Sequence, residues 1–298
     1  AALQTVQSPP VFIGNQLLVV TLKGDLISLS PINGETLWKK KLATPLGRRG
    51  FTYHESEDSE LEGIYVASGT NIVQLNKNGE IKKKFLTGLS LVQPFLDEKN
   101  LYVATLRNGV KAFDLKTKKE IWSTSLKKNK VNARVWSGFS FDKETNSLFV
   151  VTSNPGGIIG ENRSGDDFSA SLISINADNG KIKWEYKHVV NDLWDFDLIS
   201  NPIIVKKLKV INKKKLINCV IALSKTGDVI MVDIDTGLPI FDNSYVDVLV
   251  QKSDMKNVYT PPTQKFYLKP EKFSNIEVDL NNDFDHLEKD NLAFMKNK

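Results

Sequence analysis

The run Asn191-Asp192-Leu193-Trp194-Asp195 is the part of this sequence best suited to carry chemistry. Lys225 follows it in the chain, and Trp136 and Asn154 precede it. Together these positions provide a carboxylate, a fixed cation, a broad aromatic face and an amide oxygen. A set of this kind suits a single flat, oxidised ligand. The residue types therefore predict a redox site rather than a packing motif.

The composition indicates a globular protein with an ordinary charged surface. The chain has 298 residues, of which 41% are hydrophobic and 25% are charged, and no apolar run approaches the roughly 20 residues that cross a bilayer. Its formal charge of +5 comes from Lys residues that are spread along the chain, usually opposite Glu or Asp. Aromatic residues are not interleaved with them, so a solvated surface is favoured over a nucleic-acid patch.

Two further features concern processing and redox state. The chain begins with Ala1 rather than Met and lacks the pattern of a secretory signal, so we expect that processing or truncation removed the true start. Cys219 is the single cysteine, and it lies in the apolar run Cys219-Val220-Ile221-Ala222-Leu223. We expect a buried strand residue and no disulfide framework.

One sequence pattern recurs along the chain: a short strand, a polar turn that usually contains Gly, and then an aromatic residue. The turn predicts a tight hairpin, because Gly accepts a positive φ at no steric cost. One occurrence has Lys118 where Gly is expected. The five occurrences are Leu26-Ile27-Ser28-Leu29 with Gly34 and Trp38, Ile72-Val73-Gln74-Leu75 with Gly79 and Phe85, Val110-Lys111-Ala112-Phe113-Asp114 with Lys118 and Trp122, Leu172-Ile173-Ser174-Ile175 with Gly180 and Trp184, and Val229-Ile230-Met231-Val232-Asp233 with Gly237 and Phe241.

Another apolar run precedes several of these patterns. A repeating unit, made of the run and the pattern that follows it, therefore has three or four short strands. Units of this kind are typical of β-propeller blades, in which the closing aromatic residue packs between neighbouring sheets. Stacked Greek-key sandwiches are the alternative, but a recurrent closing aromatic would have no common role there. We therefore expect an all-β fold in which residues 1–270 form part of a propeller. Residues 271–298, acidic and without a strand period, are expected to begin a long connection between blades.

The sequence resembles the pyrroloquinoline-quinone (PQQ)-dependent dehydrogenases, and within them the membrane-type glucose dehydrogenase branch. The resemblance implies an eight-bladed quinoprotein propeller, of which this chain is an N-terminal to central part with about five blades. The motifs that carry it are Arg48-Arg49-Gly50-Phe51, Val135-Trp136-Ser137-Gly138, Thr152-Ser153-Asn154-Pro155, Asn191-Asp192-Leu193-Trp194-Asp195-Phe196-Asp197, Ser224-Lys225-Thr226-Gly227 and Thr260-Pro261-Pro262-Thr263-Gln264.

The resemblance implies a role for three residues around the reacting atoms. Trp136 matches the tryptophan that forms the floor under the PQQ ring. Asp195 matches the general base, which takes the proton of the substrate hydroxyl as hydride leaves. Lys225 matches the cation that stabilises negative charge on the quinone oxygens. Their neighbours Asp192 and Asp197 inherit no role, and we expect Asp192 to form a local hydrogen bond.

The resemblance also implies cofactor contacts and a calcium ion. Arg49 matches an arginine that binds PQQ from an earlier blade, with Arg48 as the alternative. Asn154 matches a cofactor-binding residue that is also a calcium ligand, and Asp195 would be the second ligand of the metal. The loop Thr105-Leu106-Arg107-Asn108-Gly109 lacks the acidic residue that relatives supply to calcium.

Other departures affect the branch and the histidines. The family commonly has His where this chain has Asn191, and the adjacent cysteine pair of the alcohol dehydrogenase branch is absent, which favours the glucose dehydrogenase branch. None of the three histidines, His54, His188 and His286, has a matched role, and His188 is expected to be exposed.

Two functions of different classes follow. The first is an enzyme that oxidises an alcohol, sugar or polyol and passes electrons to a respiratory acceptor, either ubiquinone or cytochrome c. The resemblance places such enzymes in the periplasm, with membrane association only through segments outside this chain. The second is a propeller that binds no cofactor and presents its rim to protein partners. The predicted grouping of Trp136, Asn154, Asp195 and Lys225 favours the enzyme.

Overall fold

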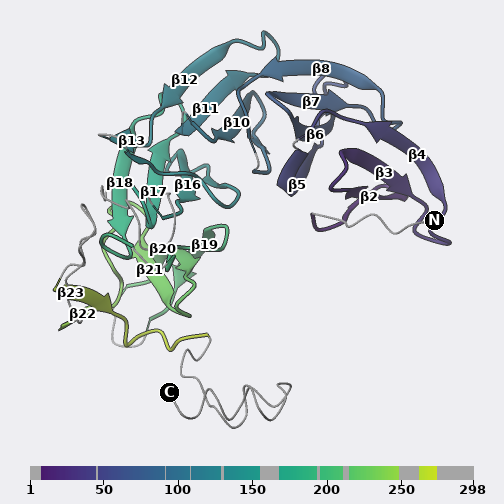
Figure 1. Cartoon of the computed structure of the whole chain (residues 1–298). Helices are drawn as coiled ribbons and strands as arrows, with labels where there is room; N and C mark the ends of the chain where they lie inside the picture. The colour runs from purple at the N-terminus through teal and green to yellow at the C-terminus, as the bar shows by residue number, and fades with distance from the viewer. Residues whose placement is uncertain are drawn as a thin grey trace, which may run out of the picture.

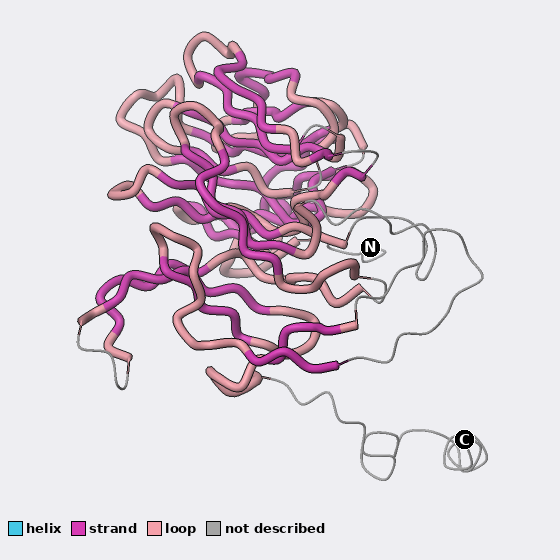
Figure 2. Tube along the Cα trace, turned by 90° about the vertical axis from the view of Figure 1, so that its left-hand side faces the viewer, coloured by secondary structure: helices cyan, strands magenta, loops and turns pink. Residues whose placement is uncertain are grey.

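The computed structural model describes residues 8–44, 46–90, 92–107, 109–128, 131–154, 168–192, 195–210, 215–247 and 262–273; the side chains of residues 46–49, 127–128 and 131–132 are outside this description. The described chain forms strands joined by loops, and it contains no helix (Figure 2). The all-β prediction is therefore confirmed. No helix among these residues could cross a membrane.

The strands form small antiparallel sheets that follow one another along an arc (Figure 1). Four sheets contain four strands each, and a fifth contains three. The four-stranded sheets are β1 (Val11–Ile13), β2 (Gln16–Val20), β3 (Asp25–Leu29) and β4 (Thr36–Lys41); β5 (Leu46–His54), β6 (Gly63–Ser68), β7 (Asn71–Leu75) and β8 (Ile81–Leu86); β9 (Phe95–Leu96), β10 (Asn100–Thr105), β11 (Gly109–Asp114) and β12 (Glu120–Thr124); and β15 (Ser140–Asp142), β16 (Ser147–Val151), β17 (Ser171–Asn176) and β18 (Ile182–Lys187).

The fifth sheet and two short ribbons complete the described strands. The fifth sheet contains β19 (Ile203–Leu208), β20 (Ile217–Leu223) and β21 (Val229–Asp233). The ribbons pair β13 (Lys127–Lys128) with β14 (Val131–Asn132), and β22 (Ser244–Asp247) with β23 (Thr263–Phe266). In Figure 1, β8 and β12 follow the outer rim of the arc, and β5 and β16 lie on its inner side. Five consecutive radial sheets agree with the propeller prediction.

The hydrophobic core lies between neighbouring sheets. For example, Leu18 and Leu26 of the first sheet pack in one cluster with Phe51, Ile64 and Val66 of the second. Every residue of β6 and of β16 is buried, because a sheet lies against each face of these strands. Their near-continuous apolar sequences are typical of such fully buried strands. Cys219 is buried in β20, as predicted.

The closing tryptophans connect successive sheets. Trp184 at the outer edge of the fourth sheet donates its indole N–H to the carbonyl of Ile234 in the fifth, at 3.1 Å. A Cβ at Gly237 in the same hairpin would lie 2.6 Å from the Trp184 ring, closer than real Cβ contacts come. Two other pairs repeat this arrangement, Trp38 with Gly79 and Trp122 with Gly180. The hairpin glycine is therefore needed for its positive φ and for the space that the indole takes.

The contact between the second and third sheets departs from this pattern. Lys83 lies opposite Gln74, at the position that Trp122 has opposite Ala112. Phe85, the predicted closing residue, is buried between these two sheets as expected, but it lies two residues further along β8 than the place that the tryptophans take in their strands. The facing hairpin has Lys118, with φ 62, where the other hairpins have Gly. Since no indole occupies this place, the hairpin has room for a Cβ.

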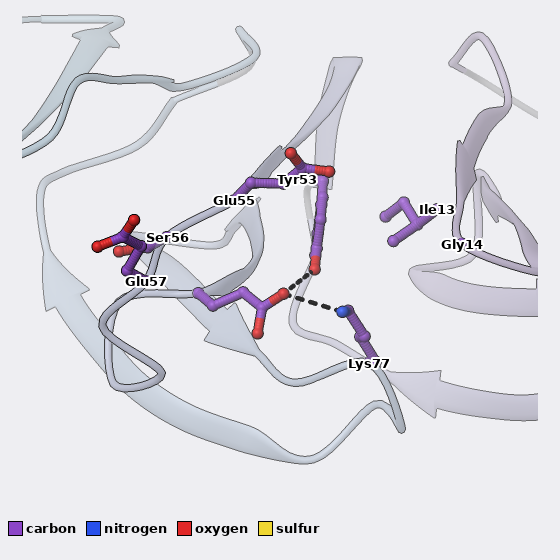
Figure 3. A pocket seen from close by; sticks show the side chains of 8 residues that line it. Ile13, Gly14, Tyr53, Glu55, Ser56, Glu57 and Lys77 are labelled. Atoms are coloured by element: carbon purple, nitrogen blue, oxygen red, sulfur yellow. Dashed lines mark hydrogen bonds and ion pairs between the residues drawn. The ribbon is translucent and has the colours of Figure 1, made fainter.

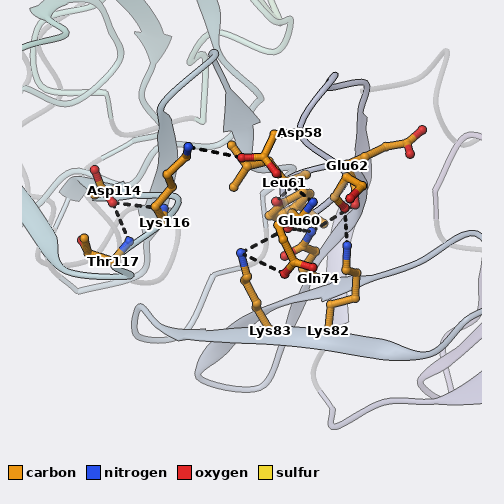
Figure 4. Close-up of polar contacts among 12 residues, drawn as sticks. Asp58, Glu60, Leu61, Glu62, Gln74, Lys82, Lys83, Asp114, Lys116 and Thr117 are labelled. Atoms are coloured by element: carbon orange, nitrogen blue, oxygen red, sulfur yellow. Dashed lines mark hydrogen bonds and ion pairs between the residues drawn. The ribbon is translucent and has the colours of Figure 1, made fainter.

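Charged contacts from the 55–62 loop replace the missing tryptophan (Figure 4). Lys83 donates to the carbonyl of Glu60 at 3.1 Å. Across the contact, Lys116 of the third-sheet hairpin pairs with Asp58 at 3.2 Å. Leu61 from the same loop is buried with Phe85. A hydrophobic cluster that includes Phe85 and Leu61 therefore joins the sheets here. The exposed ion pairs that take the place of the indole add little to it. The predicted division at residue 270 stays a prediction, because residues 274–298 lie outside the described chain.

Candidate functional site

Trp136 and Asn154 lie on two adjacent stretches just beyond the fourth sheet. One stretch precedes β15 and the other follows β16. An antiparallel bridge joins Val135 to Thr152, and the N–H of Trp136 donates to the carbonyl of Val151 at 3.2 Å. These backbone contacts extend the sheet by one step. They therefore hold the stretches that carry Trp136 and Asn154 side by side.

Asp195 and Lys225 are placed in a similar way by the fifth sheet. Leu198 and Ser224 form an antiparallel bridge, and the N–H of Lys225 donates to the carbonyl of Asp197 at 3.1 Å. Asp195 itself has φ 71, in the left-handed region that residues other than Gly seldom adopt. A strained backbone conformation persists only where the surrounding contacts hold it in place, and such positions are common at functional sites.

The loop before Asp195 is held from a distant part of the chain. The side chain of Gln264 accepts the N–H of Val190 at 3.2 Å and donates to its carbonyl at 2.7 Å. Within the loop, Asp192 accepts the N–H of Phe196 at 2.9 Å, which is the local hydrogen bond that we predicted. Residues 193–194 are outside the described chain.

Four of the five predicted site residues come together between the fourth and fifth sheets. Asn154 donates an amide N–H to Oδ1 of Asp195. The ammonium of Lys225 lies 2.8 Å from Oδ2 of Asp195 and 5.9 Å from the centre of the Trp136 ring. The fifth residue, Arg49, lies in β5, but its side chain is outside the described part of the structure.

Asp197 also lies in this group, although the family resemblance gives it no role. Its Oδ1 lies 2.6 Å from Nζ of Lys225, and its Oδ2 accepts the backbone N–H of Asn154 at 3.0 Å. Sequence reasoning missed it because Asp192, Asp195 and Asp197 are equivalent as residue types. The available signal was the closeness of the two carboxylates in the run Asp195-Phe196-Asp197.

The group is open on one side and closed on the other. Trp136 is 43% exposed, and the side chains of Asp195 and Lys225 are 38% and 30% exposed, whereas that of Asp197 is only 2% exposed. A ligand can therefore reach an indole face, a carboxylate and an ammonium together. Flat anionic molecules suit this combination, since they can stack on the ring and pair with the cation.

Burial and charge pairing set the ionisation of the group. Burial raises the pKa of Asp197 to about 6, although the Lys225 ammonium opposes the rise. Burial alone would lower the pKa of Lys225, but its hydrogen bonds to Asp195 and Asp197 raise it above the ordinary value. Lys225 is therefore a cation at neutral pH. With Asp197 ionised, two carboxylates share one ammonium.

His188 is buried, and the prediction that it is exposed is wrong. Its side chain is 3% exposed, and Nδ1 lies 3.1 Å from the hydroxyl of Tyr267. Nε2 lies 3.5 Å from the hydroxyl of Thr226, the residue after Lys225. Burial lowers the pKa of His188 to about 4, so the imidazole is neutral at physiological pH. It therefore supports the turn that carries Lys225 as an uncharged hydrogen-bonding group.

The oxygens of Asn154 and Asp195 are of the hard type that calcium prefers. The described residues contain no group of three or more His, Cys, Asp or Glu side chains that could hold a metal. Calcium takes six to eight oxygens. The described side chains therefore supply part of a calcium shell, and a bound ligand would have to supply more of it.

Two cavities lined by described residues lie away from this group. One, of about 490 Å³, lies beside the first and second sheets (Figure 3). In it the ammonium of Lys77 lies 2.9 Å from Oε1 of Glu62 and 5.6 Å from the centre of the Tyr53 ring. Another, of about 450 Å³, lies where the 55–62 loop meets the third sheet. The lining of neither cavity includes a predicted site residue.

Two family models match the chain in different regions. The model described as "Glucose/ethanol/alcohol dehydrogenase, beta-propeller domain" matches residues 124–296, which is more than half of the chain. The model described as "Outer membrane protein assembly factor BamB" matches residues 2–137. Asn154, Asp195, Asp197 and Lys225 lie only in the first of these ranges.

Individual relatives and solved structures are of the same two kinds, quinoprotein dehydrogenases and BamB. Quinoprotein glucose dehydrogenase A of Acinetobacter calcoaceticus is 22% identical over 92% of this chain and 42% of its own length. The crystal structure of quinohemoprotein alcohol dehydrogenase from Comamonas testosteroni has a TM-score of 0.67 and 17% identity, with 88% of this chain and 46% of that chain covered. BamB from Moraxella catarrhalis has a TM-score of 0.53 and 15% identity, with 80% and 62% covered.

These structural likenesses confirm the propeller fold, and the chain spans less than half of the length of the first curated relative and of the first solved structure. The family itself follows from the longer match, which covers the fourth and fifth sheets and the group of side chains between them. The chain belongs to the β-propeller family of the glucose, ethanol and alcohol dehydrogenases, the quinoproteins.

Proposed function

We propose that the complete protein is a quinoprotein dehydrogenase, which oxidises an alcohol, a sugar or a polyol and uses PQQ as cofactor. The observation that carries this proposal is the convergence of Trp136, Asn154, Asp195 and Lys225 in the part of the chain that matches the dehydrogenase family. A respiratory acceptor, ubiquinone or cytochrome c, would receive the electrons. The family resemblance supports a periplasmic location.

The exposed side of the group fits PQQ, which is flat and carries three carboxylates. The Trp136 face would support the ring, and the Lys225 ammonium beside it would pair with cofactor oxygens. Arg49 would add a second cation from the second sheet. Calcium would be held by Asn154 and Asp195 together with oxygens of the cofactor, since the described side chains do not complete its shell.

The chemical roles follow from the side chains that a substrate can reach. PQQ, when bound, supplies the quinone that accepts the hydride. Asp195 is the exposed carboxylate of the pair, so it would take the proton from the substrate hydroxyl. Lys225 would stabilise negative charge that develops on the acceptor oxygen. Asn154 holds Asp195 through its amide N–H and so limits the orientations of the carboxylate.

The test uses the full-length protein with PQQ and calcium added. Binding is measured by the quenching of tryptophan fluorescence, and turnover by the reduction of a dye during oxidation of glucose, ethanol and a polyol. We expect saturable binding, weakened in Trp136→Leu, and turnover with at least one substrate. The variant Trp122→Leu is the matched control, because Trp122 is a closing tryptophan at another contact. Absence of both binding and turnover in the wild type would exclude the proposal.

A non-catalytic scaffold is the second candidate, because residues 2–137 match the BamB model and a BamB structure has the same fold. A scaffold would present its rim to protein partners and would have no use for PQQ. It predicts neither fluorescence quenching nor dye reduction in the experiment above, and it predicts that Asp195→Asn has no effect on partner binding.

A further inference from the structure

One ammonium faces two carboxylates in this group, and the two carboxylates differ in surroundings. We propose that Asp197 is a positioning residue that holds Lys225 and Asn154, so that the carboxylate of Asp195 stays available on the open side. The positioning itself stands on the contacts of this chain. Its consequence for catalysis rests on the proposed dehydrogenase function.

Asp197 and Asp195 differ first in burial. The side chain of Asp197 is 2% exposed and lies 2.6 Å from the Lys225 ammonium, whereas that of Asp195 is 38% exposed and lies 2.8 Å from it. Water and salt screen an exposed pair, and a pair beside the protein interior is screened much less. Removal of one partner from a buried pair also leaves an uncompensated charge, which is strongly destabilising. Asp197 therefore contributes more than Asp195 to the position of Lys225.

Asp197 is also connected to the backbone of both neighbouring stretches. Asp197 accepts the N–H of Lys225 with its own carbonyl at 3.1 Å and the N–H of Asn154 with Oδ2 at 3.0 Å. One residue is thus connected to both stretches that form the site, one from the fourth sheet and one from the fifth. Asp195 contacts these two residues through its side chain. The backbone contact of Asp197 fixes it beside Lys225 independently of rotamers, and its buried side chain then reaches both the ammonium and the backbone of Asn154.

The two carboxylates therefore have different roles. Asp197 holds the ammonium beside the Trp136 ring, where it lies 5.9 Å from the ring centre. Asp195 lies on the exposed side, where a substrate hydroxyl can reach it. Without Asp197, the single cation would pair with Asp195 alone, and that carboxylate would be less free to meet a substrate hydroxyl.

The first experiment needs no cofactor. The rate at which acetic anhydride acetylates Lys225 is measured by peptide mass spectrometry in the wild type, Asp197→Asn and Asp195→Asn, with exposed Lys99 and Lys118 as internal standards. Acetylation needs an amine that is released from its ion pairs, so the rate reports how firmly each carboxylate holds Lys225. We expect a clear increase in Asp197→Asn and a smaller one in Asp195→Asn. An equal or larger increase in Asp195→Asn, or no increase in either, would overturn the proposal.

A double-mutant cycle covers the case in which Asp197→Asn folds poorly. Unfolding midpoints are compared for Asp197→Asn, Lys225→Gln and the double variant, and for the corresponding set with Asp195. We expect the double variant to recover stability that Asp197→Asn loses, because no charge is left without its partner. Larger coupling between Lys225 and Asp195, or no recovery in the double variant, contradicts the proposal.

The last experiment separates this inference from the proposed function. In the full-length protein with PQQ, Asp197→Asn should retain fluorescence quenching and lower kcat much more than it changes KM. A large change in KM with kcat unchanged would show that Asp197 serves substrate binding instead, and would overturn the positioning role. If the wild type itself neither binds PQQ nor turns over, the proposed function fails, while the acetylation rates and the cycle still decide the role of Asp197.

Discussion

The indole of Trp184 occupies the space that a Cβ would need at Gly237 in the next sheet: that Cβ would lie 2.6 Å from the ring. The closing tryptophan and the hairpin glycine are therefore a matched pair, although they lie in different sheets. Gly237 has φ +70, and Gly34 in the first hairpin has φ +74, yet a Cβ at Gly34 would meet nothing within 4 Å.

Comparison of Gly34→Ala with Gly237→Ala therefore measures the cost of the clash with the Trp184 ring apart from the cost of the positive φ. Gly34→Ala introduces only the strain of a positive φ, about 1 kcal/mol. Gly237→Ala introduces the same strain and also overpacks the Trp184 ring, for which a further loss of about 1–3 kcal/mol is expected. Urea unfolding curves of the two variants check this. Equal losses in both variants would mean that the indole moves away without cost.

The contact between the second and third sheets should accept the missing pair only when both members are introduced. Lys83→Trp alone places an indole against the Cβ of Lys118, so we expect destabilisation. Addition of Lys118→Gly should recover stability, with a coupling of about 0.5–3 kcal/mol between the two positions. The control is Lys83→Trp with Lys40→Gly, which leaves the hairpin unchanged. Thermal unfolding of the single and double variants gives the coupling, and additive effects would show that the indole does not enter this contact.

The buried His188 should make stability depend on pH in a defined window. Its pKa is about 4 in the folded chain and about 6.5 when unfolded, because burial disfavours the charged imidazole. The unfolded state therefore binds the extra proton first as pH falls. This contribution to stability is fully present above about pH 6.5 and is lost as pH falls from about 6.5 to 4.

His188→Gln provides the test, since it removes the titrating group and keeps a polar side chain near Tyr267. The difference in unfolding free energy between wild type and His188→Gln should shrink as the pH is lowered through this window. Carboxylates that titrate in the same range affect both proteins and cancel in the difference. A difference that does not change with pH would show that the imidazole is already protonated, or is accessible, in the folded chain.

Asp195→Asn should remove turnover in the full-length protein while PQQ stays bound. An amide cannot take the proton of the substrate hydroxyl, and general base catalysis contributes typically about 10²–10⁴ in rate. Asp192→Asn is the matched control, because its remaining oxygen can still accept the N–H of Phe196. We expect the control to stay within about tenfold of the wild type. Dye-linked kinetics together with fluorescence titration of PQQ decide the outcome, and unchanged turnover in Asp195→Asn would remove the base assignment.

Some of this protein could be determined from the sequence because the signal is local. The spacing from Gly34 to Trp38, repeated along the chain, reflects a hairpin and an edge strand that adjacent residues build by themselves. Near-continuous apolar runs such as β6 indicated strands buried on both faces. These patterns sufficed for the class of fold and the number of sheets, and the motifs around Trp136, Asn154, Asp195 and Lys225 indicated the site.

Tertiary structure decided what depends on distant neighbours. Phe85 and Lys83 both follow the hairpin of the second sheet, and only the packing of Leu61 from the 55–62 loop shows which one fills the contact. His188 is buried because Tyr267, 79 residues away, packs on it. Asp197 and Asp195 are the same residue type but differ in burial and contacts, which are set by two sheets that meet there. Local spacing carries none of this, because exposure and charge pairing are properties of the assembled sheets.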